Sequence, residues 1–223
     1  MKGVGGAAGT MGLIVLILLA HSPALLDPTL GAQIIRLFAF VPRWFSLAPW
    51  SNAHRLVTSV FLHGDIFHVA GNCLFLWVFG RSLLRLFGTG PFLLAFPLLG
   101  VVGLLLHWVI YPNSPVPVIG ASGAVATLMG AYLALFPKAR IKLFVFLGGF
   151  GAPVTAPAWA FLIYWGGLEL LSLAGGEGNV TSVAYAVHVG GFIAGVMAAI
   201  AWKVAYPFAE EQLSEFTTEA FKS

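Results

Sequence analysis

Four residues of types used in hydrolytic chemistry occur within apolar stretches of the sequence: His68, Asn72, Ser122 and His188. Ser122 follows a proline-rich loop and opens an apolar stretch that runs to Phe136, so it lies at or near the N-terminus of a helix. A serine hydroxyl needs a base within hydrogen-bond reach before it becomes a good nucleophile. His188 is the candidate base, because a neutral imidazole accepts the serine proton and returns it to a leaving amine. We interpret the four residues as one hydrolytic site inside a membrane.

His68 and Asn72 are four residues apart, which places both on one face of a helix. The Asn72 amide and one ring nitrogen of His68 are hydrogen-bond donors. Together with the backbone N–H of Ser122 they form a candidate set of donors for the oxyanion of a tetrahedral intermediate.

Counting along the expected helices places all four residues at a similar depth. Ser122 and His188 each lie fifteen residues, or about 22 Å of helix, from the inner end of their segments. Asn72 and His68 lie roughly 20 and 26 Å from the inner end of theirs. In a hydrocarbon core about 30 Å thick, this is one layer several ångströms below the outer surface.

Small residues beside the serine and the histidine predict a close approach of the two helices that carry them. These helix-packing residues are Gly123, Gly191 and Gly195. No Asp or Glu stands where it would obviously orient His188, so the prediction is a Ser–His dyad rather than a triad. A metal site built from three histidines (His63, His68 and His188) is the alternative, but no His-Glu-x-x-His motif or neighbouring carboxylate supports it. We therefore expect no metal.

The composition is that of a polytopic membrane protein. Hydrophobic residues make up 59% of the 223 residues and charged residues only 9%, whereas soluble domains carry about 25% charged residues. The net charge of +3 is too small and too dispersed to indicate nucleic-acid binding. The single cysteine, Cys73, excludes an intramolecular disulfide and a cysteine-based zinc site.

The pattern of apolar stretches predicts an all-α bundle of six transmembrane helices in one domain. The expected spans are 5–26, 66–86, 92–110, 122–136, 156–173 and 182–202, followed by a polar tail over 206–223. A signal peptide is the alternative interpretation of the first stretch. The connector over 27–64 mixes arginine with tryptophan, which is typical of a segment in the membrane interface. Eight basic residues on the inner side against three outside predict that both termini are cytoplasmic.

Five sequence motifs resemble those of the rhomboid intramembrane serine proteases. They run from His54 to Asn72 (HRLVTSxFxHGDxxHxxxN), 120–123 (GASG), 130–132 (GAY), 136–140 (FPKAR) and 186–191 (AxHxGG). The resemblance covers about residues 38–203. It implies a six-span helical core, with Ser122 as nucleophile, His188 as general base, and His68, Asn72 and the Ser122 amide as oxyanion donors. It also implies cleavage of single-span membrane proteins near the outer membrane boundary, without a cofactor. We expect a multi-pass protein of the bacterial inner (plasma) membrane.

The sequence departs from the family pattern at three places. His54 stands where tryptophan is common, and Arg81–Arg85 replaces an acidic stretch after the second span. Ala126 stands where some members place an aromatic residue against the catalytic histidine, so His188 needs support from elsewhere.

Glu169 is the only acid inside an apolar span. It is interpreted as structural, either protonated or paired with a hydroxyl such as that of Ser172, or as a residue that tunes water or the substrate gate.

Two other functions are weighed against proteolysis. A rhomboid-like non-catalytic protein would bind membrane clients, but such relatives usually lack the serine or the histidine, and this sequence has both. A small-solute transporter is disfavoured because the sequence has no repeat and its polar groups cluster at one depth. The natural substrate and the oligomeric state do not follow from the sequence.

Overall fold

The structure, a computed structural model, describes residues 4–147, 150–175 and 184–207. Within these residues, four helices are long and apolar enough to cross a membrane: Gly6–Leu26, Ile66–Phe87, Thr89–Ile110 and Tyr185–Ala205. Two shorter apolar helices, Ser122–Leu135 and Ala158–Ala174, complete the bundle. The predicted polytopic helical bundle is confirmed. Part of the sixth expected span (182–183) and most of the tail (208–223) lie outside the described residues.

The first half of the chain forms two long helical stretches joined by a series of short helices. Its elements are α1 (Val4–Leu26), α2 (Pro28–Phe38), α3 (Pro42–Leu47), α4 (Pro49–Asn52), α5 (Arg55–Thr58), the 3₁₀ turn η1 (Ser59–Phe61), α6 (Ile66–Phe75), the π-helical turn η2 (Leu76–Gly80) and α7 (Arg81–Phe87). A proline occupies the first position of α2, α3 and α4, where its missing N–H costs no intrahelical bond. Asp27 and Asp65 cap α2 and α6 with their side chains.

The second half contains the helices that carry the serine and the histidine. Its elements are α8 (Thr89–Leu99), α9 (Val101–Ile110), α10 (Ser122–Leu135), β1 (Arg140–Leu147), β2 (Phe150–Pro157), α11 (Ala158–Ala174) and α12 (Tyr185–Ala205). The segment between α10 and α11 was expected to be an apolar, glycine-rich connector. It is an antiparallel hairpin, in register from Arg140 opposite Pro157 to Leu147 opposite Phe150. Consequently α11 begins at Ala158, slightly later than the expected residue 156.

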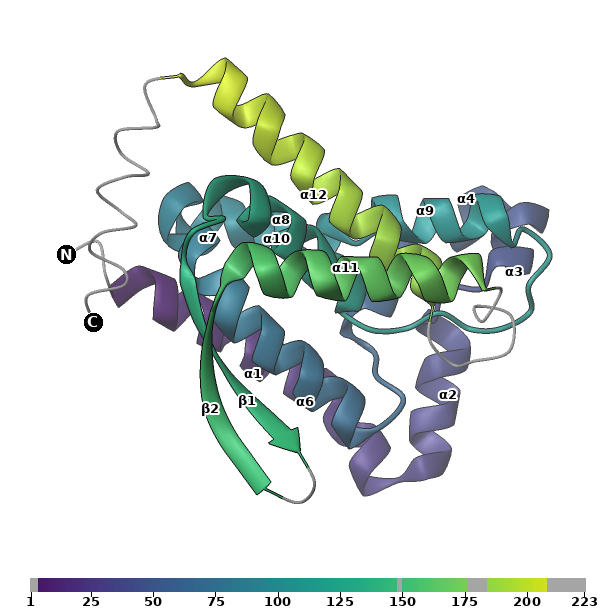
Figure 1. The fold of residues 1–223 in the computed structure, drawn as a ribbon. Coiled ribbons are helices and arrows are strands. Elements are labelled where there is room, and N and C mark those ends of the chain that lie inside the picture. Colours follow the sequence, from purple (N-terminus) through teal and green to yellow (C-terminus); the bar gives the residue numbers. More distant parts are fainter. Residues whose placement is uncertain (1–3, 148–149, 176–183, 208–223) are drawn as a thin grey trace.

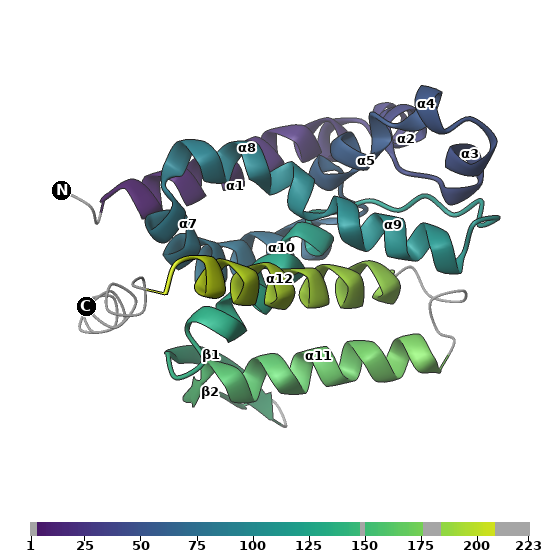
Figure 2. The same ribbon diagram turned by 90° about the horizontal axis from the view of Figure 1, so that it is seen from above.

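Helix α10 lies at the centre of the bundle, and most of its residues are buried (Figures 1 and 2). Its apolar and small residues cover every face of the helix instead of forming one stripe, as expected where neighbouring helices surround it. Leu13 and Ile17 of α1 lie in the same core as α10, so the first helix packs into the bundle. The beginning of α1, the α7–α8 turn and the end of α12 lie at one end of the bundle, and the connector α2–α5 lies at the other.

The connector holds the loop that leads into α10. Phe40 and Val118 exchange two backbone hydrogen bonds, of 3.2 and 2.7 Å, in an isolated antiparallel bridge. Arg55 donates to the carbonyls of Arg36 and Ala39, each over 3.0 Å, and its guanidinium lies 5.0 Å from the centre of the Trp44 ring. The connector is therefore an ordered structure, and it fixes the loop at the end of the bundle where α10 begins.

Candidate active site

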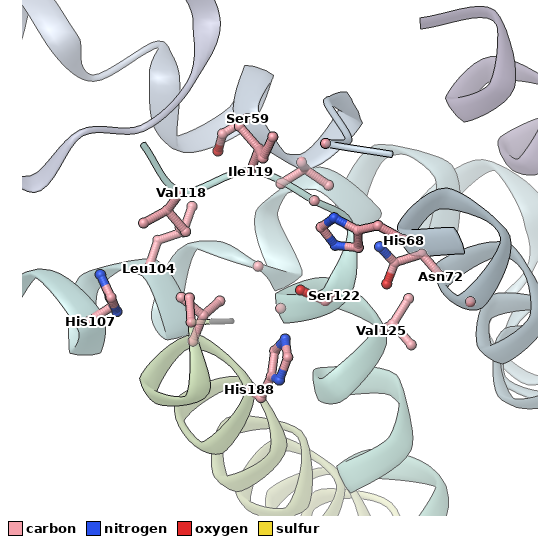
Figure 3. Close-up of a pocket in the computed structure, with 18 of the residues that line it drawn as sticks. Ser59, His68, Asn72, Leu104, His107, Val118, Ile119, Ser122, Val125 and His188 are labelled. Atoms are coloured by element: carbon pink, nitrogen blue, oxygen red, sulfur yellow. The ribbon is translucent and has the colours of Figure 1, made fainter. Parts of the chain in front are cut away.

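Ser122, His188, His68 and Asn72 line one cavity of about 510 Å³. They come from three elements, α10, α12 and α6. Figure 3 shows Ser122 between His188 on one side and His68 and Asn72 on the other. The structure thus brings together the four polar residues that the sequence placed at one depth. No hydrogen bond joins Ser122 to His188 among the described residues, so their relationship rests on the shared cavity.

Ser122 is the first residue of α10, and the preceding turn sets its position. Gly120 has a φ of +121°, a conformation that favours glycine, and its N–H donates to the Ser59 carbonyl over 2.9 Å. The Ala121 N–H donates to Nε2 of His63 over 3.4 Å. Burial lowers the pKa of His63 to about 4, so this ring is neutral and able to accept. The Ser122 N–H lies in the first helical turn, where amides have no intrahelical acceptor and favour an anion.

His68 and Asn72 lie one turn apart on α6, as their spacing predicts. Asp65 fixes the first turn of this helix, because its carboxylate accepts from the N–H groups of Phe67 (2.8 Å) and His68 (2.9 Å). The hydrogen bond from the His68 N–H is the main reason why the pKa of Asp65 lies below its usual value. The Asn72 side chain is buried, and its Nδ2 has no hydrogen-bond partner within the described part of the chain. Nδ2 is therefore a donor available to a bound acceptor.

His188 is held by α11. Its Nδ1 lies 2.7 Å from Oε2 of Glu169, and the two side chains are only 14% and 13% exposed. The Trp165 ring lies one turn earlier on α11, with its centroid 6.1 Å from that of the His188 ring. In Figure 3 the imidazole extends from α12 toward Ser122. Nε2, the nitrogen that does not contact Glu169, is therefore the one that faces the serine.

Glycines set the distance between α10 and α12. A Cβ at Gly191 would lie 2.5 Å from the carbonyl oxygen of Gly123, and one at Gly195 would collide with the Thr127 carbonyl. A Cβ at Gly123 would in turn lie 2.7 Å from a methyl group of Val187. The two backbones are thus in direct contact along the stretch that carries Ser122 and His188, as small residues permit in membrane helices.

The sequence reasoning missed the contact between Glu169 and His188. No acid was expected to orient the histidine, and Glu169 was interpreted as protonated or paired with a hydroxyl such as that of Ser172, or as a residue that tunes water or the gate. The structure instead places its carboxylate 2.7 Å from Nδ1 of His188. The signal was present in the sequence, since Glu169 is the only acid in an apolar span.

Two of the three histidines of the alternative metal site lie close together: the ring centroids of His63 and His68 are 5.0 Å apart. Over residues 4–147, 150–175 and 184–207, no group of three or more His, Cys, Asp or Glu side chains is arranged to hold a metal ion.

A bundle of apolar helices that encloses a serine, two histidines and an asparagine in one cavity defines a class: polytopic membrane proteins with a polar cavity inside the helical bundle. Comparison with known families matches residues 50–204 to the rhomboid domain. The chain belongs to the rhomboid family.

Three relatives illustrate the range of the family. The chain is 35% identical over 166 residues to RHOMBOID-like protein 12, mitochondrial, of Arabidopsis thaliana, in a match that covers 67% of this chain and 45% of that protein. It is 35% identical over 151 residues to Rhomboid protein 1, mitochondrial, of Saccharomyces cerevisiae (64% and 40%). It is 32% identical over 165 residues to Rhomboid protease GluP of Bacillus subtilis (74% and 29%). The matches span less than half the length of each relative.

The comparisons bear on location as well. They support an integral, multi-pass membrane protein. Two of the relatives are mitochondrial and one is bacterial, so the expected assignment to the bacterial plasma membrane is not supported.

Proposed function

We propose that this protein is an intramembrane serine endopeptidase that hydrolyses peptide bonds of single-span membrane proteins near the outer membrane boundary. One observation carries the proposal: in a member of the rhomboid family, the candidate nucleophile, base and oxyanion donors line one cavity although they come from three helices. The relative named a rhomboid protease supports the same activity.

The proposed reaction uses groups of this chain alone. Ser122 Oγ attacks the scissile carbonyl carbon while its proton passes to Nε2 of His188. The resulting oxyanion accepts hydrogen bonds from the Ser122 N–H, the Asn72 amide and the His68 ring. Collapse of the intermediate breaks the C–N bond, and His188 gives its proton to the departing amine. Water then attacks the acyl-enzyme, again with His188 as base, and releases the acid and Ser122.

The test uses the detergent-solubilised full chain, a fluorophosphonate probe and a model single-span substrate. Wild-type protein should be labelled and should cleave, and Ser122→Ala should do neither. His188→Ala should lose both activities to a similar extent, and the double variant should be no worse than either single variant, because the two residues act as a unit. Equal labelling of wild type and Ser122→Ala would overturn the proposal, and so would an unlabelled, inactive wild type.

The oxyanion donors are tested separately. Asn72→Leu keeps the side-chain volume and removes the amide, so turnover should fall by about 10²–10³ while the substrate still binds. Cys73→Ala is the matched control, because Cys73 is the next residue on α6 and does not line the cavity. If both variants keep wild-type turnover, Asn72 is not an oxyanion donor.

A further inference from the structure

Glu169 is the only charged residue of α11, and its side chain is 13% exposed. An ionisable group within an apolar helix is costly, and such groups usually face a cavity and pair with a partner. Glu169 does both: it lines the cavity that contains Ser122, and it contacts His188. Over residues 4–147, 150–175 and 184–207, no other acidic side chain is found in such close contact with a histidine, lysine or arginine side chain. The proposed reaction leaves the carboxylate without a role.

The geometry allows two protonation patterns, and only one of them suits a base. A neutral imidazole has one donor nitrogen and one acceptor nitrogen. If Glu169 is ionised, Oε2 accepts from Nδ1–H across the 2.7 Å contact, and the lone pair remains on Nε2. If Glu169 is protonated, it donates to Nδ1, and the proton on Nε2 prevents that nitrogen from accepting another.

Trp165 restricts the same ring from the same helix. Trp165 and Glu169 are four residues apart on α11, so they lie on one face of it. The indole centroid lies 6.1 Å from that of the imidazole, at an interplanar angle of 35°. The carboxylate of Glu169 thus contacts Nδ1 of the His188 ring, and the indole of Trp165 lies beside the same ring. Together they limit rotation of the imidazole.

We infer that Glu169 is a positioning residue for His188: its carboxylate holds the imidazole proton on Nδ1, directs Nε2 toward Ser122, and stabilises the imidazolium formed when the serine proton is taken up. The inference rests on the proposed function, because it assigns a partner to the proposed base. The site is then a Ser–His–Glu arrangement whose three members come from three different helices, α10, α12 and α11.

The first test is kinetic. Glu169→Gln keeps the shape of the side chain but removes the charge, and its NH₂ group can donate to Nδ1 and force the wrong tautomer. We expect its kcat to fall at least about tenfold, with a much smaller change in KM, because Glu169 acts through His188. Glu169→Asp keeps the carboxylate one methylene further away and should retain more activity than Glu169→Gln. Ser172→Ala, on the same helix but outside the cavity lining, is the control and should keep wild-type kcat.

The second test reads the tautomer directly. In protein labelled with ¹⁵N-histidine, the His188 signals are assigned as those missing from His188→Ala. Wild-type His188 should carry its proton on Nδ1, and Glu169→Gln should shift part or all of the population to the Nε2–H form. A purely structural role for Glu169 would leave the tautomer unchanged.

The outcomes separate this inference from the proposed function. If Ser122→Ala is inactive but Glu169→Gln keeps wild-type kcat, the protease assignment stands and the inference fails. The inference also fails if wild-type His188 is protonated on Nε2, or if Glu169→Gln is more active than Glu169→Asp. If Ser122→Ala retains activity, the proposed function itself fails. Thermal unfolding of each variant in detergent identifies those whose loss of activity reflects unfolding, and for them the tautomer in wild-type protein decides.

Discussion

Helix α12 meets its two neighbours in different ways. Against α10 the contact is between backbones: Gly191 faces the Gly123 carbonyl, and Gly195 faces that of Thr127, with no space for a Cβ at either glycine. Against α11 the contact is between side chains. The side chains of Glu169 and Trp165 extend from α11 to His188. The ring centroid of Trp165 also lies 5.7 Å from that of Phe192.

These two kinds of contact meet two requirements of an active site built from two helices: the distance between the reacting residues and the orientation of the base. A contact between backbones cannot yield by changing a rotamer, so it fixes the distance between Ser122 and His188. A contact between side chains fixes the orientation of a ring and adjusts when one member changes. Helix α11 is also less enclosed, with Leu168, Leu170 and Leu171 exposed at the surface of the bundle. Substitutions at the α10–α12 contact should therefore cost more activity than substitutions of neutral side chains at the α11–α12 contact.

Among substitutions at the contacts of α12, the largest effect is expected from Gly191→Val. The new Cβ would lie 2.5 Å from the Gly123 carbonyl, next to Ser122, so the helices must separate. A displacement of about 1 Å in a catalytic arrangement costs roughly 10²-fold in rate. We expect cleavage and fluorophosphonate labelling to fall by about this factor, although every reactive group remains.

The matched control is Ala198→Val, which adds two methyl groups to the same helix at an exposed position. It should leave cleavage near the wild-type rate. If Gly191→Val also keeps the wild-type rate, the backbone contact does not set the distance between the serine and the histidine, and the comparison between the two faces of α12 loses its basis.

Gly120→Ala tests whether a backbone fit also governs the turn before α10. Alanine rarely adopts a φ of +121°, and its Cβ would lie 2.7 Å from Nε2 of His68. Displacement of the His68 ring weakens one oxyanion donor without removing it, so turnover should fall by about tenfold, less than the roughly 10²–10³ for complete loss of a donor. Gly12→Ala on α1, where a Cβ meets nothing within 4 Å, should have no effect on turnover. Wild-type turnover in both variants would show that the turn tolerates a side chain.

Much of the fold is predictable from the sequence because long apolar stretches leave few alternatives. The stretches that contain His68 and His188 form helices close to their expected bounds, since a bilayer requires backbone groups to be satisfied within each segment. The paired strands β1 and β2, over 140–147 and 150–157, were not predicted. Short runs rich in aromatic and β-branched residues, such as β1, do not distinguish a strand from other apolar structure by periodicity alone.

The candidate site was likewise predictable only in part: the sequence gives the depth of its residues but not which of them pair across helices. Depth follows from counting residues along a helix, so the sequence predicts that Ser122, His188, His68 and Asn72 share a layer. Pairing across helices depends on how each helix is rotated about its axis, and counting gives no information about that rotation. Ser172 was a reasonable partner for Glu169 because it lies one turn away on the same helix. His188 becomes the partner only because α11 turns this face toward α12.

The smallest effect is expected from Trp165→Leu, which tests the side-chain contact on α11 without removing a charge. Leucine retains an apolar wall but loses the ring-to-ring contact with His188, whose centroid lies 6.1 Å away. Aromatic pairs of this kind contribute about 0.5–1.5 kcal/mol, so kcat should fall by roughly twofold to tenfold. Phe161→Leu is the control, because this ring lies one turn earlier on α11 and packs against Phe75 and Phe79. It should lower the unfolding temperature while changing kcat little.

Equal losses of kcat in Trp165→Leu and Phe161→Leu would mean that α11 acts through its general packing. A loss in Trp165→Leu as large as that in Gly191→Val would mean that the orientation of the His188 ring matters as much as its distance from Ser122.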